Sequence, residues 1–178
     1  SGVTEMAETI QALSDIVKMN TVNDNEKPVA DYLANLLKQH GIDAKLIDYG
    51  PNRTSLVAEI GDGNGPVVGF DGHEDTVALG DASKWAVPAL SATIKDNRLF
   101  GRGATDMKAG LMAGVFAFIN LKEANVPLHG TLRLMATVGE EDGHLGAEQL
   151  VDLGYADDID ALIAVSYTHL RAHETLSD

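Results

Sequence analysis

The sequence contains no cysteine among its 178 residues. A disulfide framework and a thiolate metal site are therefore excluded, and any metal must be held by histidine or carboxylate side chains. The lack of cysteine also fits a cytoplasmic protein. Basic residues are scarce, because 13 lysines and arginines stand against 27 acids, which gives a formal net charge of −14. This charge argues against nucleic acid and anionic membranes as partners.

Long apolar runs are missing as well. No stretch is long enough to span a bilayer, and the first residues lack the basic and then apolar pattern of a signal peptide, so we expect no membrane partner. Hydrophobic residues make up 44% of the chain and charged residues 22%, as in ordinary soluble globular proteins. The length fits one domain with a substantial core.

The periodicity of the apolar residues predicts strands that alternate with helices. Strands are expected at 44–50, 55–61, 66–70, 130–139 and 159–165, with two short ones within 90–103 around an Asp96-Asn97 turn. Helices are expected at 4–18, 26–40, 106–124 and 147–154. Small residues in the third helix suggest close packing against a sheet. The alternation predicts an α/β fold with a largely buried sheet.

Acidic residues gather at three predicted strand ends, which is where sites collect in α/β sheets. His73 and Asp75 lie in the run GHEDTV, Asp106 opens the third helix in GRGATDMKAG, and Glu140 and Glu141 follow the strand at 130–139. Each group alone is weak, since an aspartate that opens a helix is usually an N-cap and paired glutamates usually lie in a solvated loop. Their joint occurrence indicates a site.

Two-metal hydrolysis is the chemistry that uses such a set. Two zinc-type ions need a shared carboxylate, flanking histidine and carboxylate ligands, and a base for the attacking water. A lone aspartate can bridge two ions. Adjacent glutamates can divide the remaining work, because their side chains diverge at a strand exit.

The motifs GHEDTV, GRGATDMKAG and TVGEEDGHLGAEQL, in this order and spacing, resemble the di-zinc acylase and exopeptidase family. That family includes acetylornithine deacetylase, succinyl-diaminopimelate desuccinylase, aminoacylase and glutamate carboxypeptidase. The overall sequence pattern most resembles its bacterial desuccinylase/deacetylase branch. The likeness implies a three-layer α/β catalytic domain with a mixed, largely parallel sheet. Residues 1–164 would be the N-terminal portion of that domain, and the lid domain through which the full-length protein would form a homodimer is missing.

The resemblance also implies a role for each site residue. His73 would bind one metal, with Asp75 orienting its imidazole. Asp106 would bridge two divalent ions, which we expect to be zinc, with cobalt as an alternative, and Glu141 would bind the second ion. Glu140 would act as the base toward water and then protonate the leaving amine. The implied reaction is hydrolysis of an amide in a small acylated amino acid, with cleavage of a short peptide by a di-zinc exopeptidase as the alternative.

Four further residues near the motifs are expected to have lesser roles. Glu74 should face solvent and should not be a ligand. Trp85 should pack within the loop that follows the first motif. Arg102 and Lys108 should either neutralise the acidic site or pair with nearby carboxylates.

Residues 165–178 are expected to be a non-native tail. The run VSYTHLRAHET resembles one reading frame of a transposon-end sequencing adapter. His169 and His173 have a helical spacing that could hold zinc, but residues of a non-native segment are no evidence of a native metal site.

In the family, the strand that corresponds to 159–165 continues into an acid-proline segment whose carboxylate binds the same metal as His73. Residues 166–168 stand there instead, and the closing part of the catalytic domain, with a late histidine ligand, is also missing. Three of the five implied ligands remain, namely His73, Asp106 and Glu141. The chain by itself is therefore expected to expose apolar surface, to bind zinc weakly and to hydrolyse nothing.

Two other classes of function compete with the enzyme. A nucleotide-binding module is suggested by Gly101-x-Gly103 at a strand-to-helix turn, but Asp106 replaces the third glycine and would place negative charge where a phosphate must lie. A non-catalytic relative with the same fold is the other alternative. The bridging aspartate and the two glutamates argue against it for the full-length protein.

Overall fold

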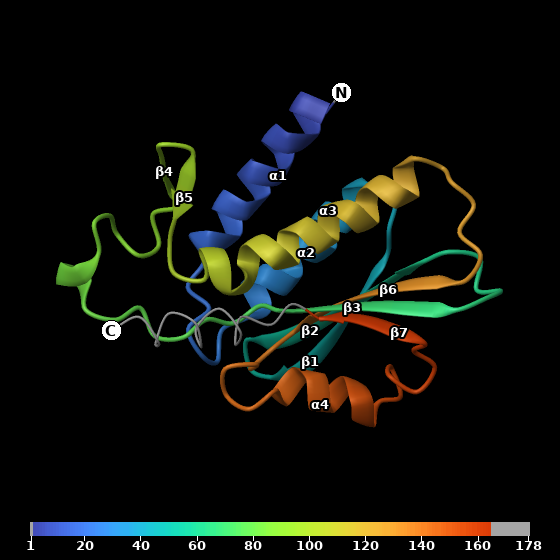
Figure 1. The fold of residues 1–178 in the computed structure, drawn as a ribbon. Helices are drawn as coiled ribbons and strands as arrows, with labels where there is room; N and C mark the ends of the chain where they lie inside the picture. Colours follow the sequence, from blue (N-terminus) through green and yellow to red (C-terminus); the bar gives the residue numbers. More distant parts are fainter. Residues whose placement is uncertain (1, 165–178) are drawn as a thin grey trace, which may run out of the picture.

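The computed structural model of the protein describes residues 2–164, which form one central sheet flanked by helices (Figure 1). The expected non-native tail, with His169 and His173, lies outside the described residues. The sheet strands are β1 (Ala44–Gly50), β2 (Arg53–Ile60), β3 (Val67–His73), β6 (Thr131–Thr137) and β7 (Ala161–Ala164). The helices are α1 (Gly2–Val17), α2 (Lys27–Gln39), α3 (Ala109–Glu123) and α4 (Leu145–Asp152). A separate hairpin pairs β4 (Thr93–Lys95) with β5 (Arg98–Phe100).

The strand order in the sheet is β1-β2-β6-β3-β7. β3 runs parallel to both β6 and β7, whereas β2 is antiparallel to its neighbours β1 and β6. Four of the five strands therefore point the same way, and the expected mixed, largely parallel sheet is confirmed. In the register of the β3–β6 pair, His73 lies opposite Thr137. The first and third sequence motifs thus leave the sheet side by side.

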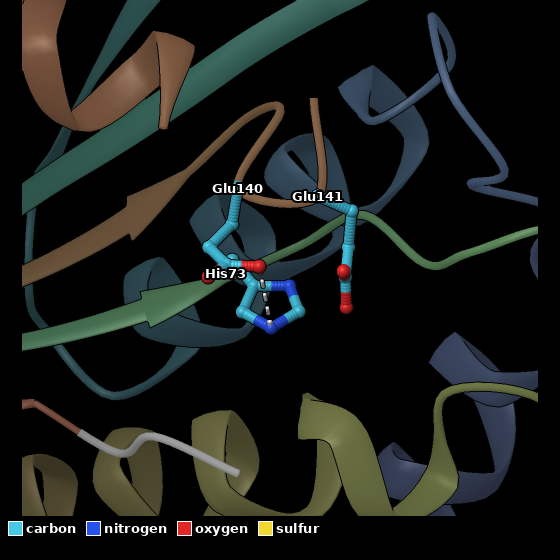
Figure 2. Close-up of side chains that lie close together, drawn as sticks. All are labelled: His73, Glu140 and Glu141. Atoms are coloured by element: carbon cyan, nitrogen blue, oxygen red, sulfur yellow. Dashed lines mark ion pairs between the residues drawn. The ribbon is translucent and has the colours of Figure 1, made fainter. Parts of the chain in front are cut away.

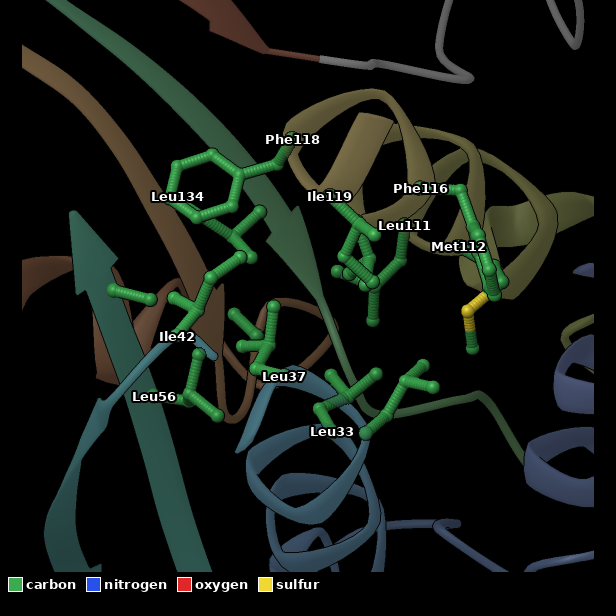
Figure 3. Packing of buried hydrophobic residues seen from close by; sticks show 14 of the residues in the cluster. Leu33, Leu37, Ile42, Leu56, Leu111, Met112, Phe116, Phe118, Ile119 and Leu134 are labelled. Atoms are coloured by element: carbon green, nitrogen blue, oxygen red, sulfur yellow. The ribbon is translucent and has the colours of Figure 1, made fainter. Parts of the chain in front are cut away.

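Helices cover both faces of the sheet, which confirms the three-layer arrangement. Figure 1 shows α1, α2 and α3 on one face and α4 on the other. The main core lies under the first group, where Leu33 and Leu37 of α2 and Leu111 of α3 meet Leu134 of β6 (Figure 3). A smaller cluster packs Leu150 of α4 against the opposite face. Burying each such side chain contributes about 1.5–3 kcal/mol.

The small residues of α3 bring this helix close to β3, as the sequence suggested. A Cβ atom placed on Gly114 would lie 2.4 Å from the ring of Phe70. Only a residue without a side chain permits this approach, and α3 therefore holds the loop that precedes it close to the carboxyl end of β3.

The prediction that Asp106 opens the third helix is wrong. α3 begins at Ala109, and Asp106 lies in an irregular turn, Ala104–Lys108, with extended backbone angles (φ −118°, ψ 93°). The turn follows Gly103, whose φ of 77° lies in the left-handed region that favours glycine. Small residues on both sides of this turn made the helix seem longer in the sequence. Asp106 therefore stands outside the helix, and the residue at the N-cap of α3 is Lys108.

None of the helices within residues 2–164 combines the length and apolar character needed to cross a bilayer. β7 forms one edge of the sheet and leaves Leu162 and Ile163 more than half exposed.

Candidate metal centre

The three sequence motifs meet at the carboxyl ends of β3 and β6. His73 ends β3, and its Nε2 atom lies 3.1 Å from Oδ1 of Asp106 and 3.9 Å from Oε2 of Glu140. One ligand atom each from His73, Glu140 and Glu141 falls within 4.8 Å of the others. Figure 2 shows both glutamates reaching from one turn toward the imidazole ring. The structure therefore brings the sequence-derived candidates together.

His73 is buried and surrounded by carboxylates. Its Nδ1 atom lies 3.0 Å from the backbone oxygen of Asp75 and 3.3 Å from Oδ1 of the same residue. Burial alone would lower the pKa of His73, but Asp75, Glu140 and Asp106 outweigh it and raise the pKa to about 9. The ring is therefore oriented from its Nδ1 side, and Nε2 faces the remaining acids.

Asp75 is fully buried and contacts more than the imidazole. Its Oδ1 and Oδ2 atoms accept the backbone N–H groups of Glu140 and Glu141, each at 3.0 Å. Burial works to raise the pKa of Asp75, but His73 and these two amides lower it overall. Asp75 thus couples the exit of β3 to the turn after β6. No local pattern in the sequence indicates this second contact, because it depends on the register between two strands.

The two glutamates lie close to other acids and remain partly exposed. Burial, followed by the charges of Glu140 and Asp106, raises the pKa of Glu141. Oε1 of Glu140 also lies 3.6 Å from Nδ1 of His144. A cation would relieve this crowding of negative charge. The donor set is one imidazole nitrogen with several carboxylate oxygens, which suits zinc and similar divalent ions.

The expectation that Glu74 faces solvent is wrong. Glu74 is fully buried, and neither of its carboxylate oxygens has a hydrogen-bond partner among residues 2–164. Burial, and then the nearby Glu26 and Asp75, raise its pKa well above the ordinary value. The reason is that the segment that follows β3 does not reach the protein surface. The N–H of Glu74 donates to the carbonyl of Thr137 at the end of β6, and the carbonyl of Glu74 accepts from the hydroxyl of Thr21 in the loop between α1 and α2, so both segments cover it.

Lys108 is also fully buried, and it links the Asp106 turn to α1. Its Nζ donates to the carbonyl oxygens of Ile16 at 2.8 Å and Met19 at 3.1 Å. Burial lowers the pKa of Lys108 to about 8, although Glu74 and Asp75 act in the opposite direction. The charge of Lys108 therefore faces nearby carboxylates, while its hydrogen bonds go to the end of α1.

Arg102 and Trp85 pack against each other in the loop region after β3. The guanidinium of Arg102 lies 5.1 Å from the centre of the Trp85 ring. Both side chains donate to the carbonyl of Leu79, at 3.3 and 2.8 Å respectively. The expected packing role of Trp85 agrees with these contacts.

The sequence matches the profile of Peptidase family M20/M25/M40 over residues 69–174, more than half of the chain. A probable succinyl-diaminopimelate desuccinylase from Staphylococcus epidermidis is 51% identical over 154 residues, which cover 86% of this chain and 38% of that protein. This chain thus spans well under half the length of that relative.

Solved structures support the same fold. An M20 family metallo-carboxypeptidase from Sulfolobus solfataricus superposes with a TM-score of 0.77 at 24% identity, over 88% of this chain and 37% of that one. A dinuclear metal binding peptidase of the M20 family from Bacillus subtilis gives a TM-score of 0.66 at 17% identity, over 92% and 43% of the two chains. The resemblance drawn from the three motifs is therefore confirmed, and the chain belongs to Peptidase family M20/M25/M40.

Proposed function

We propose that residues 1–164 are the N-terminal portion of the catalytic domain of a metal-dependent amide hydrolase of the desuccinylase/deacetylase type. The observation that carries this proposal is the meeting of His73, Asp106, Glu140 and Glu141 at the carboxyl ends of β3 and β6. The 51% identity to a probable succinyl-diaminopimelate desuccinylase supports an N-succinyl or N-acetyl amino acid as substrate of the full-length protein.

The metal site is proposed to hold two divalent ions, with zinc as the resident metal. His73 would bind one ion, Glu141 the other, and Asp106 both. When bound, such ions polarise an amide carbonyl and acidify the attacking water. The partial exposure of Glu141 and Asp106 leaves this face of the site open to a small molecule.

Two carboxylates of the chain would act beside the ions. Glu140 is partly exposed, with its side chain 37% accessible, and lies 3.9 Å from His73, so it can reach both water and a substrate. In this role it takes a proton from the attacking water and delivers it to the leaving amine. Asp75 holds the imidazole of His73 from its Nδ1 side, which keeps Nε2 available as a ligand atom.

The 178-residue chain is proposed to be inactive by itself. It covers 38% of the S. epidermidis relative, so the remaining metal ligands and the lid that contacts substrate would lie in the missing part. We further propose that residues 165–178 are not native, and that the full-length protein forms a homodimer through the lid.

The test uses the full-length protein, in which residues 1–164 continue into the native remainder. The protein is stripped with a chelator, reconstituted with zinc or cobalt, and assayed on N-succinyl-diaminopimelate, N-acetylornithine and a set of dipeptides. We expect metal-dependent release of succinate or acetate, and none from the 178-residue chain. Dipeptide cleavage without deacylation would favour an exopeptidase, and no hydrolysis of any of these substrates by the reconstituted protein would refute the proposal.

A further inference from the structure

The turn that carries the two glutamates is held by its backbone. Three consecutive N–H groups, those of residues 139–141, each donate to a buried carboxylate. Asp75 accepts from Glu140 and Glu141, as described above. The third acceptor is Glu26, whose Oε2 atom lies 2.8 Å from the backbone nitrogen of Gly139. Glu26 is the residue just before α2, so its hydrogen bond connects a distant part of the chain to this turn.

Glu26 is fully buried and paired with Arg53, the first residue of β2. Nε and Nη2 of Arg53 donate to the two carboxylate oxygens of Glu26, at 3.0 and 2.8 Å. The hydrogen bonds that Arg53 donates to Glu26 raise the pKa of Arg53, although burial opposes them. The flat guanidinium and the carboxylate thus meet in a two-bond arrangement that fixes their mutual orientation.

The guanidinium of Arg53 also packs directly on the turn. Its Nη2 atom lies 3.5 Å from Oδ2 of Asp142, which follows the two glutamates. A Cβ atom placed on Gly139 would lie 2.9 Å from the same Nη2 atom, and the φ of Gly139 is +61°. Contacts of Glu26 and Arg53 therefore hold the turn on both sides of Glu140 and Glu141, at Gly139 and at Asp142.

The burial of this pair points to a role beyond stability. Desolvating two charges costs about as much as their attraction returns, so a buried ion pair is weak evidence of net stabilisation. What the pair does provide is a fixed geometry, because each group has several directed bonds. One of those bonds, from the N–H of Gly139 to Glu26, ends on the backbone of the turn that carries the candidate base and a candidate metal ligand.

We propose that Glu26 and Arg53 are positioning residues that fix the Glu140–Glu141 turn and thereby the geometry of the metal site. The first half of this inference concerns the turn alone. The second half rests on the proposed function, because it requires that the site bind metal.

The 178-residue chain is suitable for the test, since it contains both halves of the contact. Glu26→Gln removes the negative charge and keeps the shape of the side chain. Arg53→Lys keeps the positive charge but loses the two-bond geometry of the guanidinium, and Arg53→Met removes both. Arg133→Met is the matched control. Arg133 is also a buried arginine of the sheet, 7% exposed, but it donates to Glu59 at 2.8 Å and to Asp158 at 2.6 Å and contacts neither glutamate of the site.

The first readout is amide hydrogen exchange of residues 139–141 by NMR, which needs no metal. Arg53→Met and Arg133→Met should both lower the unfolding temperature. Glu26→Gln and Arg53→Met should speed exchange in the turn by at least about tenfold relative to the slowest amides of β6 in the same variant, whereas Arg133→Met should not. Arg53→Lys should give an intermediate value. Unchanged exchange in Glu26→Gln and Arg53→Lys, the two mildest variants, would overturn the positioning role even if Arg53→Met does not fold.

The second readout is cobalt binding, which is monitored through the visible absorption of the bound ion at a temperature where each variant is folded. Glu26→Gln and Arg53→Met should weaken binding by on the order of 10–100-fold, and Arg133→Met should leave it unchanged. If the wild-type chain and the full-length protein bind no cobalt, the proposed function fails while the exchange result still decides the positioning role. Equal cobalt affinity in all variants would overturn the link between this pair and the metal site.

Discussion

Replacing Asp75 with asparagine is expected to loosen the turn after β6 while the sheet stays intact. Asp75 is fully buried, and its two oxygens accept the N–H groups of Glu140 and Glu141, each at 3.0 Å. Asparagine has nearly the same volume but offers one acceptor oxygen and one NH₂ donor. One of the two backbone N–H groups would therefore face another donor, and His73 would lose the anionic neighbour on its Nδ1 side.

The size of the effect follows from these contacts. A hydrogen bond to a charged group contributes about 1.5–3 kcal/mol, and a buried donor without a partner costs about 1–3 kcal/mol. Since one bond is lost and the other becomes neutral, the free energy of unfolding at neutral pH should fall by about 2–4 kcal/mol.

The effect should also depend on pH. Burial tends to raise the pKa of Asp75, but His73 and the two amides lower it below the ordinary value of 3.8. A group whose pKa is lowered by folding contributes stability above its unfolded-state pKa, and that stability is lost as the pH falls through the folded-state pKa. The difference between wild type and Asp75→Asn should therefore shrink below about pH 4.

Urea unfolding of the 178-residue chain at neutral and acid pH measures both quantities. Asp62→Asn is the matched control, because Asp62 also accepts two backbone N–H groups, those of Asn64 at 2.8 Å and Gly130 at 2.9 Å, but its side chain is 39% exposed. The control should lose less stability. The reasoning would be refuted if Asp75→Asn lost no more than Asp62→Asn, or if its loss were the same at both pH values.

Two further predictions concern the helices. The ring nitrogens of His40 face Glu123 and Glu8, and the hydrogen bond with Glu123, helped by Glu8 and opposed by burial, raises the pKa of His40 above 6.5. A group whose pKa is raised by folding adds stability below its unfolded-state pKa, and this stability is lost as the pH rises. His40→Gln should therefore lower the urea midpoint more at about pH 5.5 than at about pH 9. Equal losses at the two pH values would contradict this prediction. Gly114→Ala should lose about 1–2 kcal/mol in urea unfolding, since its Cβ would lie 2.4 Å from the ring of Phe70 and helix propensity offsets only part of the cost; an unchanged midpoint would show that the ring can move away.

The sequence predicted the layers and the meeting of the acids because both depend on local patterns. Apolar periodicity marked each strand of the sheet, and the acids that follow His73, together with those that follow Val138, stand where those patterns stop. In a sheet whose strands β3 and β6 are parallel, these ends must lie side by side. The site could therefore be anticipated without knowledge of any long-range contact.

The errors and omissions all involve contacts between distant segments. Glu74 was expected in solvent because nothing in its own neighbourhood shows that residues 20–22 cover it. The pairing of Glu26 with Arg53 joins a helix start to a strand start, and neither position has a periodicity that points to the other. Asp106 was placed in a helix because a turn that follows a left-handed glycine cannot be separated by composition from the helix beyond it.

The most direct test of the account measures metal content and turnover together in the full-length protein and in its Glu140→Ala variant. We expect two zinc ions per chain in both proteins, with hydrolysis in the wild type and none in the variant, because Glu140 is assigned as the base and not as a ligand. Loss of zinc along with turnover in the variant would contradict that assignment. A wild-type protein that holds no zinc after reconstitution would contradict the metal centre itself.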